Sequence, residues 1–206
     1  MVSRFLFNFF LLFVVCITVF TACQSSSGAT SEAPASLAKQ SLHAELTWTA
    51  YKFTNKTPVV GRFKEIRLMP VTTEGDILEQ LSKLNFSIPV NSISTDNEER
   101  DTKILLYFFG NLRSANEIYG EIDWIDTANQ RIVVSLTLNE VEQDITMDYT
   151  LTPDGVSMKG TLDLGQFEAY AGLEGLNKVC EALHKGPDGV SKLWDVVDLQ
   201  ILIRNL

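Results

Sequence analysis

Eight segments of the chain alternate apolar and polar residues with a period of two, and this pattern limits the fold more than any other feature. A period of two places successive side chains on opposite faces, as in a β-strand with one buried face. Short turns such as 152–155, Thr-Pro-Asp-Gly, separate neighbouring segments, so most strands should pair antiparallel. The segments are residues 46–50, 59–63, 84–90, 118–124, 132–138, 141–151, 156–164 and 197–203.

Eight such strands predict an all-β fold, an eight-stranded antiparallel barrel of the lipocalin-like kind. The interior of a barrel of this size is either filled by side chains or holds one slender ligand. A two-sheet sandwich is the competing architecture. In the first segment the alternation changes phase between Ala50 and Tyr51, which predicts a β-bulge there.

Two segments interrupt the β pattern and predict two short helices. Residues 95–98, Thr-Asp-Asn-Glu, resemble a capping box, and the helix they begin ends at Gly110. The second helix runs near Glu174 to His184 and is stopped by a Gly-Pro pair at 186–187. Each helix is expected to cover one end of the barrel.

Three residues of the first helix are candidates for a lid or mouth of the barrel. Phe108 and Phe109 form an aromatic pair, for which packing is the alternative role. Arg100 is placed to meet a polar head group, and pairing of Arg100 and Asp101 with neighbouring charges is the alternative.

The first 22 residues predict a lipoprotein signal peptide. Arg4 precedes an apolar stretch from Phe9 to Phe20, whose helix would rise about 18 Å, too short for a bilayer core of roughly 30 Å. The stretch ends in Phe-Thr-Ala-Cys at residues 20–23, which resembles a lipoprotein cleavage box and predicts lipidation of Cys23. An ordinary secretory signal is the alternative.

Residues 23–41 predict a lipidated cysteine followed by a flexible tether, since they are rich in Ser and Ala and poor in large apolar groups. Acyl chains on Cys23 would hold the domain of residues 42–206 at a membrane surface. The expected location is the bacterial cell envelope, facing the periplasm. Gln24 after the cysteine favours the outer membrane over the inner membrane.

Composition and motifs argue against several classes of function. A net charge of −9, without a basic patch, excludes nucleic acid as a partner. No spacing of the two histidines and three cysteines matches a metal site. A hydrolase would need His184 with Asp188 and Ser191, yet the chain has no nucleophile-elbow motif. Cys180 lies on an apolar helical face, which favours a buried small hydrophobe over a reactive thiol. We therefore expect no enzyme, no metal and no cofactor other than a bound lipid.

Several motifs resemble the YceI-like family over residues 45–206. They are Trp-Thr-Ala-Tyr-Lys at 48–52, Pro-Val-Val-Gly-Arg-Phe-Lys at 58–64, Ser-Ile-Ser-Thr at 92–95 followed by Arg100-Asp101 and Phe108-Phe109, and Leu-Trp-Asp-Val-Val at 193–197. The resemblance implies a lipocalin-like barrel around a long isoprenoid or similar lipid chain, in periplasmic proteins without a known catalytic role. Thr-Trp-Thr at 47–49 stands where soluble members often have a His-Ser or Thr-Ser pattern.

With this resemblance we expect a membrane-anchored periplasmic protein that encloses an isoprenoid or similar chain for sequestration or transport. The expected partners are an apolar lipid and, through acylated Cys23, a membrane. A filled barrel that acts as a protein-interaction module is the alternative, because the same large residues can simply fill a core. The candidate lumen residues are Trp48, Phe63, Phe86, Ile88, Trp124, Val134, Leu136, Met147, Met158, Leu162, Leu199 and Ile201.

Overall fold

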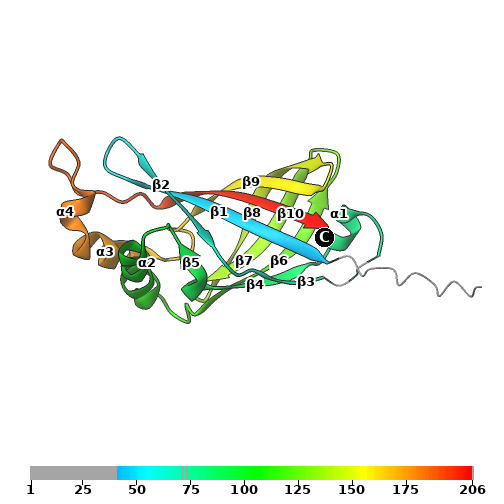
Figure 1. Ribbon diagram of the computed structural model, residues 1–206, viewed down its shortest axis with the longest axis horizontal. Coiled ribbons are helices and arrows are strands. Elements are labelled where there is room, and N and C mark those ends of the chain that lie inside the picture. The colour runs from blue at the N-terminus through cyan, green and yellow to red at the C-terminus, as the bar shows by residue number, and fades with distance from the viewer. Residues whose placement is uncertain (1–40, 71, 73, 206) are drawn as a thin grey trace, which may run out of the picture. The chain divides into compact units, whose positions relative to one another are not determined.

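The computed structural model describes residues 41–70, 72 and 74–205, and in this part of the chain ten strands form one antiparallel sheet. The predicted leader, most of the tether and Cys23 lie outside the described residues. The sheet curls into a barrel (Figure 1). Its strands are β1 (Leu42–Lys52), β2 (Thr57–Phe63), β3 (Arg67–Met69), β4 (Asn85–Pro89), β5 (Ile93–Ser94), β6 (Glu117–Asp126), β7 (Arg131–Leu138), β8 (Val141–Thr152), β9 (Gly155–Asp163) and β10 (Val196–Asn205).

The predicted antiparallel barrel is confirmed, but it has ten strands rather than eight because two strands are interrupted. The order of the sheet is β3-β4-β6-β7-β8-β9-β10-β1-β2-β5. β2 continues into β3 after three residues, and β4 ends at Pro89 and continues into β5 after a 3₁₀ turn, Val90–Ser92. β2 pairs with β5, β3 pairs with β4, and the Lys64 N–H donates to the Ser92 carbonyl between them (2.8 Å). β3 and β5, the first and last strands of this order, therefore belong to the same interrupted pair of strands. This pairing closes the sheet into a barrel.

The bulge lies in a different strand from the predicted one. The register of β1 with β2 is unbroken from Thr47 to Lys52, so the bulge predicted at Ala50 is wrong. The register shifts instead in β6, where Ile122 pairs with Val134 but Trp124 pairs with Val133. The additional residue of a bulge reverses which side chains face the interior.

The prediction that Trp124 faces the lumen is therefore wrong. Its side chain is 57% exposed on the outside of the barrel, whereas Ile122, before the bulge, is buried. Strict alternation along β6 would have put both residues on the inner face, and the bulge at Asp123 separates them.

The first predicted helix is present, but only its first part is α-helical. α2 (Glu98–Lys103) leads into a π turn, η2 (Ile104–Phe108), and a 3₁₀ turn, η3 (Phe109–Asn111). Its N-cap is Asn97, whose side chain accepts a hydrogen bond from the Arg100 N–H (2.9 Å), so the expected capping role of Thr95 is wrong.

The second predicted helix is longer than expected and divided in two. α3 (Tyr170–Val179) begins four residues earlier than predicted, and it is separated from α4 (Glu181–His184) at Cys180. α1 (Ile77–Leu81) was not predicted, although Asp76 and Glu79 form a capping box there. Figure 1 shows α2, α3 and α4 together at one end of the barrel and α1 near the other end.

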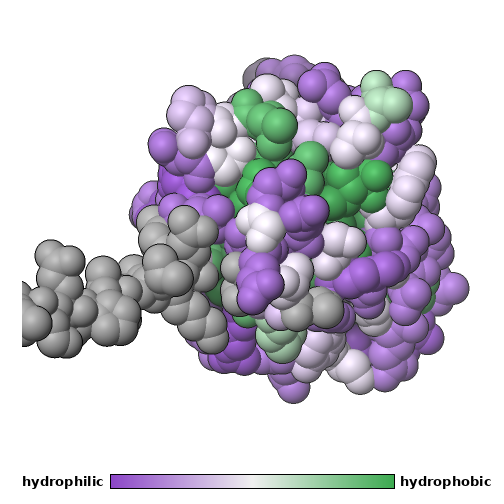
Figure 2. Space-filling model, turned by 90° about the vertical axis from the view of Figure 1, so that its right-hand side faces the viewer, coloured by the Kyte–Doolittle hydropathy of each residue, from purple (hydrophilic) through white to green (hydrophobic). Residues whose placement is uncertain are grey.

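The barrel end beside α1 has an apolar centre and a polar rim. Figure 2 looks onto this end, and hydrophobic side chains gather toward the middle of the face, surrounded by hydrophilic ones. None of the helices in the described ranges is long and apolar enough to cross a membrane.

Asn139, in the turn between β7 and β8, joins three segments of the chain. Its Oδ1 accepts a hydrogen bond from the Arg113 N–H (2.7 Å), and its Nδ2 donates to the carbonyls of Phe167 (2.9 Å) and Glu168 (3.1 Å). The side chain is buried, and its φ of 56° lies in the left-handed region that asparagine tolerates.

We expect Asn139→Ala to lower the free energy of unfolding by about 2–4 kcal/mol, because it leaves buried backbone groups without partners. Urea denaturation measures this loss. Asn129→Ala is the matched control, since Asn129 lies in the exposed turn between β6 and β7 and hydrogen-bonds only to Asp126. Equal losses for the two variants would contradict the proposed role of Asn139.

Candidate functional site

The barrel encloses an apolar cavity of about 190 Å³. Its wall is built from strands on all sides of the barrel, and at the helical end it is completed by Ile104 and Phe108 of η2 and by Leu173 and Leu176 of α3. An engineered cavity of about 150 Å³ lined by such residues stays dry and binds benzene. The cavity is thus large enough for a segment of an apolar guest.

Ten of the twelve predicted lumen residues line this cavity. Of the other two, Trp124 lies outside, and Met158 is buried within the wall but does not line the cavity. The ten are Trp48, Phe63, Phe86, Ile88, Val134, Leu136, Met147, Leu162, Leu199 and Ile201.

Sequence reasoning missed further residues of the wall. Seven of them continue the same alternating faces and could have been found from the pattern: Leu46, Ala50, Ile118, Leu138, Ile145, Leu164 and Val197. The others lie on helices, in turns or next to strand ends, where alternation gives no signal. They are Tyr51, Ile93, Ile104, Leu173, Leu176, Leu193 and Trp194.

Two large rings of the wall lie over glycines of the neighbouring strand instead of crossing the lumen. Trp48 of β1 pairs with Gly61 of β2, and Phe86 of β4 pairs with Gly120 of β6. A Cβ atom added at Gly61 would overlap the Trp48 indole, and one added at Gly120 would overlap the Phe86 ring. The absent side chains make room for the rings to lie along the wall.

Met147 has the same relation to a third glycine. A Cβ at Gly160 would lie 2.9 Å from the Met147 Cγ. Three large inward side chains, Trp48, Phe86 and Met147, are thus accommodated by glycines in the wall. This arrangement leaves the centre open, and it argues against the filled barrel.

A second pocket, of about 470 Å³, lies at the helical end of the barrel. It is bounded by β1, β2, α2, α3 and α4, and we call it the mouth pocket. Lys52, Arg100, Lys103 and Glu99 contribute charged groups to it. Six residues line both the mouth pocket and the apolar cavity, so the two spaces adjoin; they are Trp48, Ala50, Tyr51, Ile104, Leu176 and Leu193.

The three candidate lid residues divide between the two spaces. Phe108 and Phe109 line the apolar cavity and pack edge to face, with ring centroids 5.0 Å apart. Arg100 lines the mouth pocket. Asp101 serves the local structure, since its carboxylate accepts hydrogen bonds from the N–H (2.8 Å) and the hydroxyl (2.6 Å) of Thr95.

His184 and Cys180 line the mouth pocket but are not part of a hydrolytic triad. The His184 Nδ1 is bonded to the Asn177 Oδ1 (3.0 Å), and Ser191 donates to that same oxygen (3.0 Å). Asp188 instead accepts a hydrogen bond from Thr54. Burial raises the pKa of the Cys180 thiol, which keeps it protonated. Within the described ranges, no group of three or more His, Cys, Asp or Glu side chains is placed to hold a metal ion.

The pKa of His184 is lowered to about 4 by burial and by the nearby charge of Lys52. The unfolded chain therefore binds one more proton than the folded protein between pH 4 and pH 6.5. The contribution of neutral His184 to the free energy of unfolding is therefore fully present above pH 6.5, and it is lost as the pH falls toward 4.

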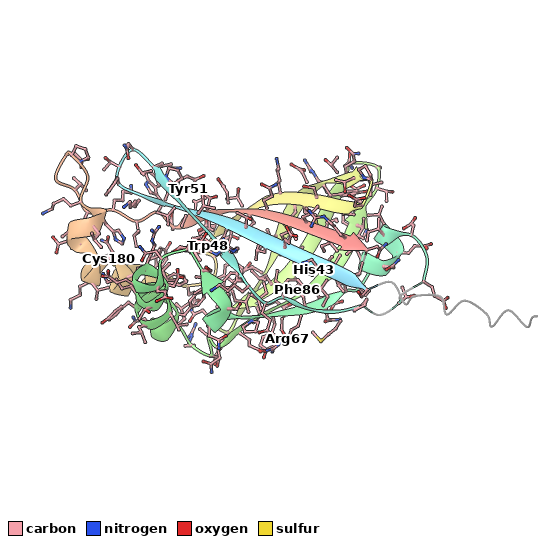
Figure 3. The ribbon with its side chains drawn as sticks, in the orientation of Figure 1. His43, Trp48, Tyr51, Arg67, Phe86 and Cys180 are labelled. Carbon is pink, nitrogen blue, oxygen red and sulfur yellow. The ribbon has the colours of Figure 1, made fainter. Side chains whose placement is uncertain are left out.

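We expect His184→Asn, which keeps a donor near Nδ1, to reduce the loss of stability between pH 6.5 and pH 4.5. Urea denaturation at several pH values measures the slope of the free energy of unfolding against pH. His43→Asn is the matched control, because His43 lies exposed on β1 far from the helical end (Figure 3). A slope unchanged by His184→Asn would show that other groups cause the pH dependence.

The chain thus forms an antiparallel barrel around an apolar cavity, with α2, α3 and α4 at one end, and this architecture is that of the lipocalin-like barrels. The model of the YceI-like domain matches residues 38–204, and the chain belongs to this family. A search of curated protein sequences finds no match.

Solved structures share the fold at low sequence identity. A polyisoprenoid-binding domain from Saccharophagus degradans, implicated in plant cell wall breakdown, is 13% identical, with a TM-score of 0.58; the match covers 81% of this chain and 97% of that one. Burkholderia cenocepacia BcnA is 9% identical, with a TM-score of 0.53 and coverages of 78% and 94%. The Campylobacter jejuni YCEI protein is 18% identical, with a TM-score of 0.51 and coverages of 75% and 89%.

Proposed function

We propose that the barrel binds the apolar chain of an isoprenoid or similar lipid. The observation that carries this proposal is the open apolar cavity, in which large rings lie over wall glycines. Transfer of a chain from water into such a cavity contributes about 0.8 kcal/mol for each buried CH₂ group. Affinity for the chain therefore needs few polar contacts. Membership of the YceI-like family and the likeness to a polyisoprenoid-binding domain support this choice of ligand.

The protein acts, in this proposal, as a binding protein that sequesters or carries its lipid in the periplasm. Cys23, acylated after removal of residues 1–22, would anchor it to a membrane, with the outer membrane favoured by Gln24. Residues 24–41 would then be the tether between the anchor and the barrel. The support for this part is the sequence of the leader alone.

Native mass spectrometry of residues 38–206, purified without the leader, tests the proposal directly. We expect an adduct of one hydrophobic molecule per chain, which organic extraction followed by mass analysis would identify by class. Folded protein at its bare mass that also takes up no added isoprenoid would contradict the proposal. That result would favour the interaction module instead.

A further inference from the structure

One surface at the helical end of the barrel combines exposed apolar side chains with an excess of lysine. It consists of the turn between β1 and β2, residues 51–57, and the segment from the end of α3 through the loop after α4, residues 178–193. We call this surface the basic tip. Figure 1 shows both segments at the same end of the barrel, and the Phe53 N–H donates to the Lys192 carbonyl between them (2.9 Å).

Three large apolar side chains of the basic tip are exposed. Val179, Leu183 and Val190 have exposed fractions of 41%, 58% and 47%. The Gly186 N–H donates to the Val190 carbonyl (3.0 Å), which folds the loop back onto the end of α4. The exposed large hydrophobic residues of the strands are instead spread over β2, β3, β6 and β8. Exposed apolar side chains that gather on one surface mark a binding site for a protein or a membrane.

The charge of the basic tip is opposite to that of the whole chain. Its five lysines and two acids give it a net charge of +3, whereas the chain carries −9. A surface that joins apolar side chains to lysines is complementary to a bilayer with anionic lipids, which offers acyl chains beneath a layer of phosphates. The lysines are Lys52, Lys56, Lys178, Lys185 and Lys192, and the acids are Glu181 and Asp188.

We propose that the basic tip docks onto the surface of an anionic phospholipid bilayer. Val179, Leu183 and Val190 enter the boundary between head groups and acyl chains, and the lysines lie among the lipid phosphates. The affinity grows with the apolar area that is buried. It also grows about fivefold for each lysine that lies near the anionic surface.

The place of the basic tip favours a bilayer over a protein partner. Lys52, Leu183 and His184 belong to the tip and also line the mouth pocket, which adjoins the apolar cavity. Docking therefore places the mouth pocket against the membrane, and an apolar guest passes between membrane and cavity without entering water. Each CH₂ group that had to enter water would make that passage about fourfold rarer. This use of the tip rests on the proposed function, whereas docking itself needs no guest.

A lipid anchor at Cys23 would not prevent this contact. β1 begins at the opposite end of the barrel, so the chain reaches the barrel there (Figure 1). Eleven residues of β1 span about 36 Å. Residues 24–41 reach about 60 Å when fully extended, which is longer. The basic tip can therefore touch the membrane that holds the anchor.

Co-sedimentation of residues 38–206 with lipid vesicles tests docking in the absence of an anchor. These residues form one compact unit that contains all ten strands. One set of vesicles is phosphatidylcholine, and the other is an equal mixture of phosphatidylcholine and phosphatidylglycerol. We expect the mixed vesicles to bind about tenfold or more tightly than phosphatidylcholine alone. Added salt should reduce this preference.

Two substitutions in the basic tip should weaken binding to the mixed vesicles. Lys185→Gln should weaken it about fivefold, and Leu183→Ser should weaken it several-fold. Lys159→Gln and Leu151→Ser are the matched controls, because these side chains are exposed on β9 and β8 rather than on the tip. The controls should leave binding nearly unchanged. Thermal unfolding of every variant checks that the barrel is folded.

A fluorescent label identifies the surface that meets the bilayer. Val190→Cys, labelled with a nitrobenzoxadiazole group, should shift its emission to shorter wavelength when mixed vesicles are added. The same label on Leu151→Cys should not shift. Cys180, the remaining cysteine of residues 38–206, is 5% exposed and is therefore protected from the label.

The outcomes separate docking from the proposed function. Equal binding to the two kinds of vesicle, equal losses in the tip and control variants, or a shift of the label at Leu151→Cys alone would overturn the inference. A dimer in sedimentation equilibrium that Leu183→Ser dissociates would show that a second copy of the chain covers the tip, and it would also overturn the inference. The lipid adduct in native mass spectra is measured without vesicles, so the proposed function stands or fails by that result.

Discussion

Leu136→Trp is expected to abolish lipid uptake while leaving the barrel folded. Leu136 lies in β7, is buried and lines the apolar cavity. A larger side chain there would enter the space that the guest chain needs. Because that space is open, the indole would gain contacts in it, and we expect at most a small change in the free energy of unfolding. The adduct in native mass spectra and the midpoint of urea denaturation measure the two effects.

Leu151→Trp is the matched control for this substitution. Leu151 lies exposed on β8, so the same change of side chain should alter neither lipid uptake nor stability. A loss of about 1–3 kcal/mol or more in Leu136→Trp alone would indicate overpacking of a filled core, because added volume in a packed interior typically costs that much. That outcome would remove the main support for the proposed function.

Gly61→Ala is expected to reduce both stability and lipid binding, although it adds a single methyl group. The new Cβ would overlap the six-membered ring of Trp48, which has no flexible end that could move aside. Either the indole moves into the lumen or β1 and β2 separate. We expect a loss of about 1–3 kcal/mol in the free energy of unfolding, together with loss of the bound lipid.

A second substitution shows whether the indole causes this effect. Trp48→Leu in the Gly61→Ala background should recover most of the lost stability, so that the two changes are strongly non-additive in a double-mutant cycle. Gly110→Ala is the matched control, because a Cβ there would meet only the Leu105 carbonyl oxygen at 3.5 Å, an ordinary contact. Additive losses in the cycle would contradict the ring-over-glycine arrangement.

The strands and most of the cavity wall could be predicted because alternation depends only on local geometry. Residues such as Phe63, Val134 and Ile201 face inward wherever a strand keeps its period. The rule fails at Trp124, because the bulge at Asp123 adds a residue that no local pattern reveals. Alternation gives no prediction for Leu173 and Trp194, because they line the cavity from a helix and from the segment before β10.

Whether the barrel is open or filled could not be predicted from the residues alone. Gly61 and Gly120 are visible in the sequence as inward positions of strands. Their effect depends on strand register, which places Trp48 beside one and Phe86 beside the other. The mouth pocket likewise depends on β1, α2 and α4 meeting at one end, so Lys52 and His184 could not be placed together in advance.

The open cavity makes the lifetime of this protein depend on its cargo. Under the proposed function, the guest binds only the folded barrel and therefore adds RT ln(1 + [L]/Kd) to its stability, about 2.7 kcal/mol when the free lipid is a hundredfold above Kd. Proteases that attack the transiently unfolded chain then find it about a hundredfold less often. The amount of the protein present in a cell would therefore depend on how much lipid is available to bind in its cavity.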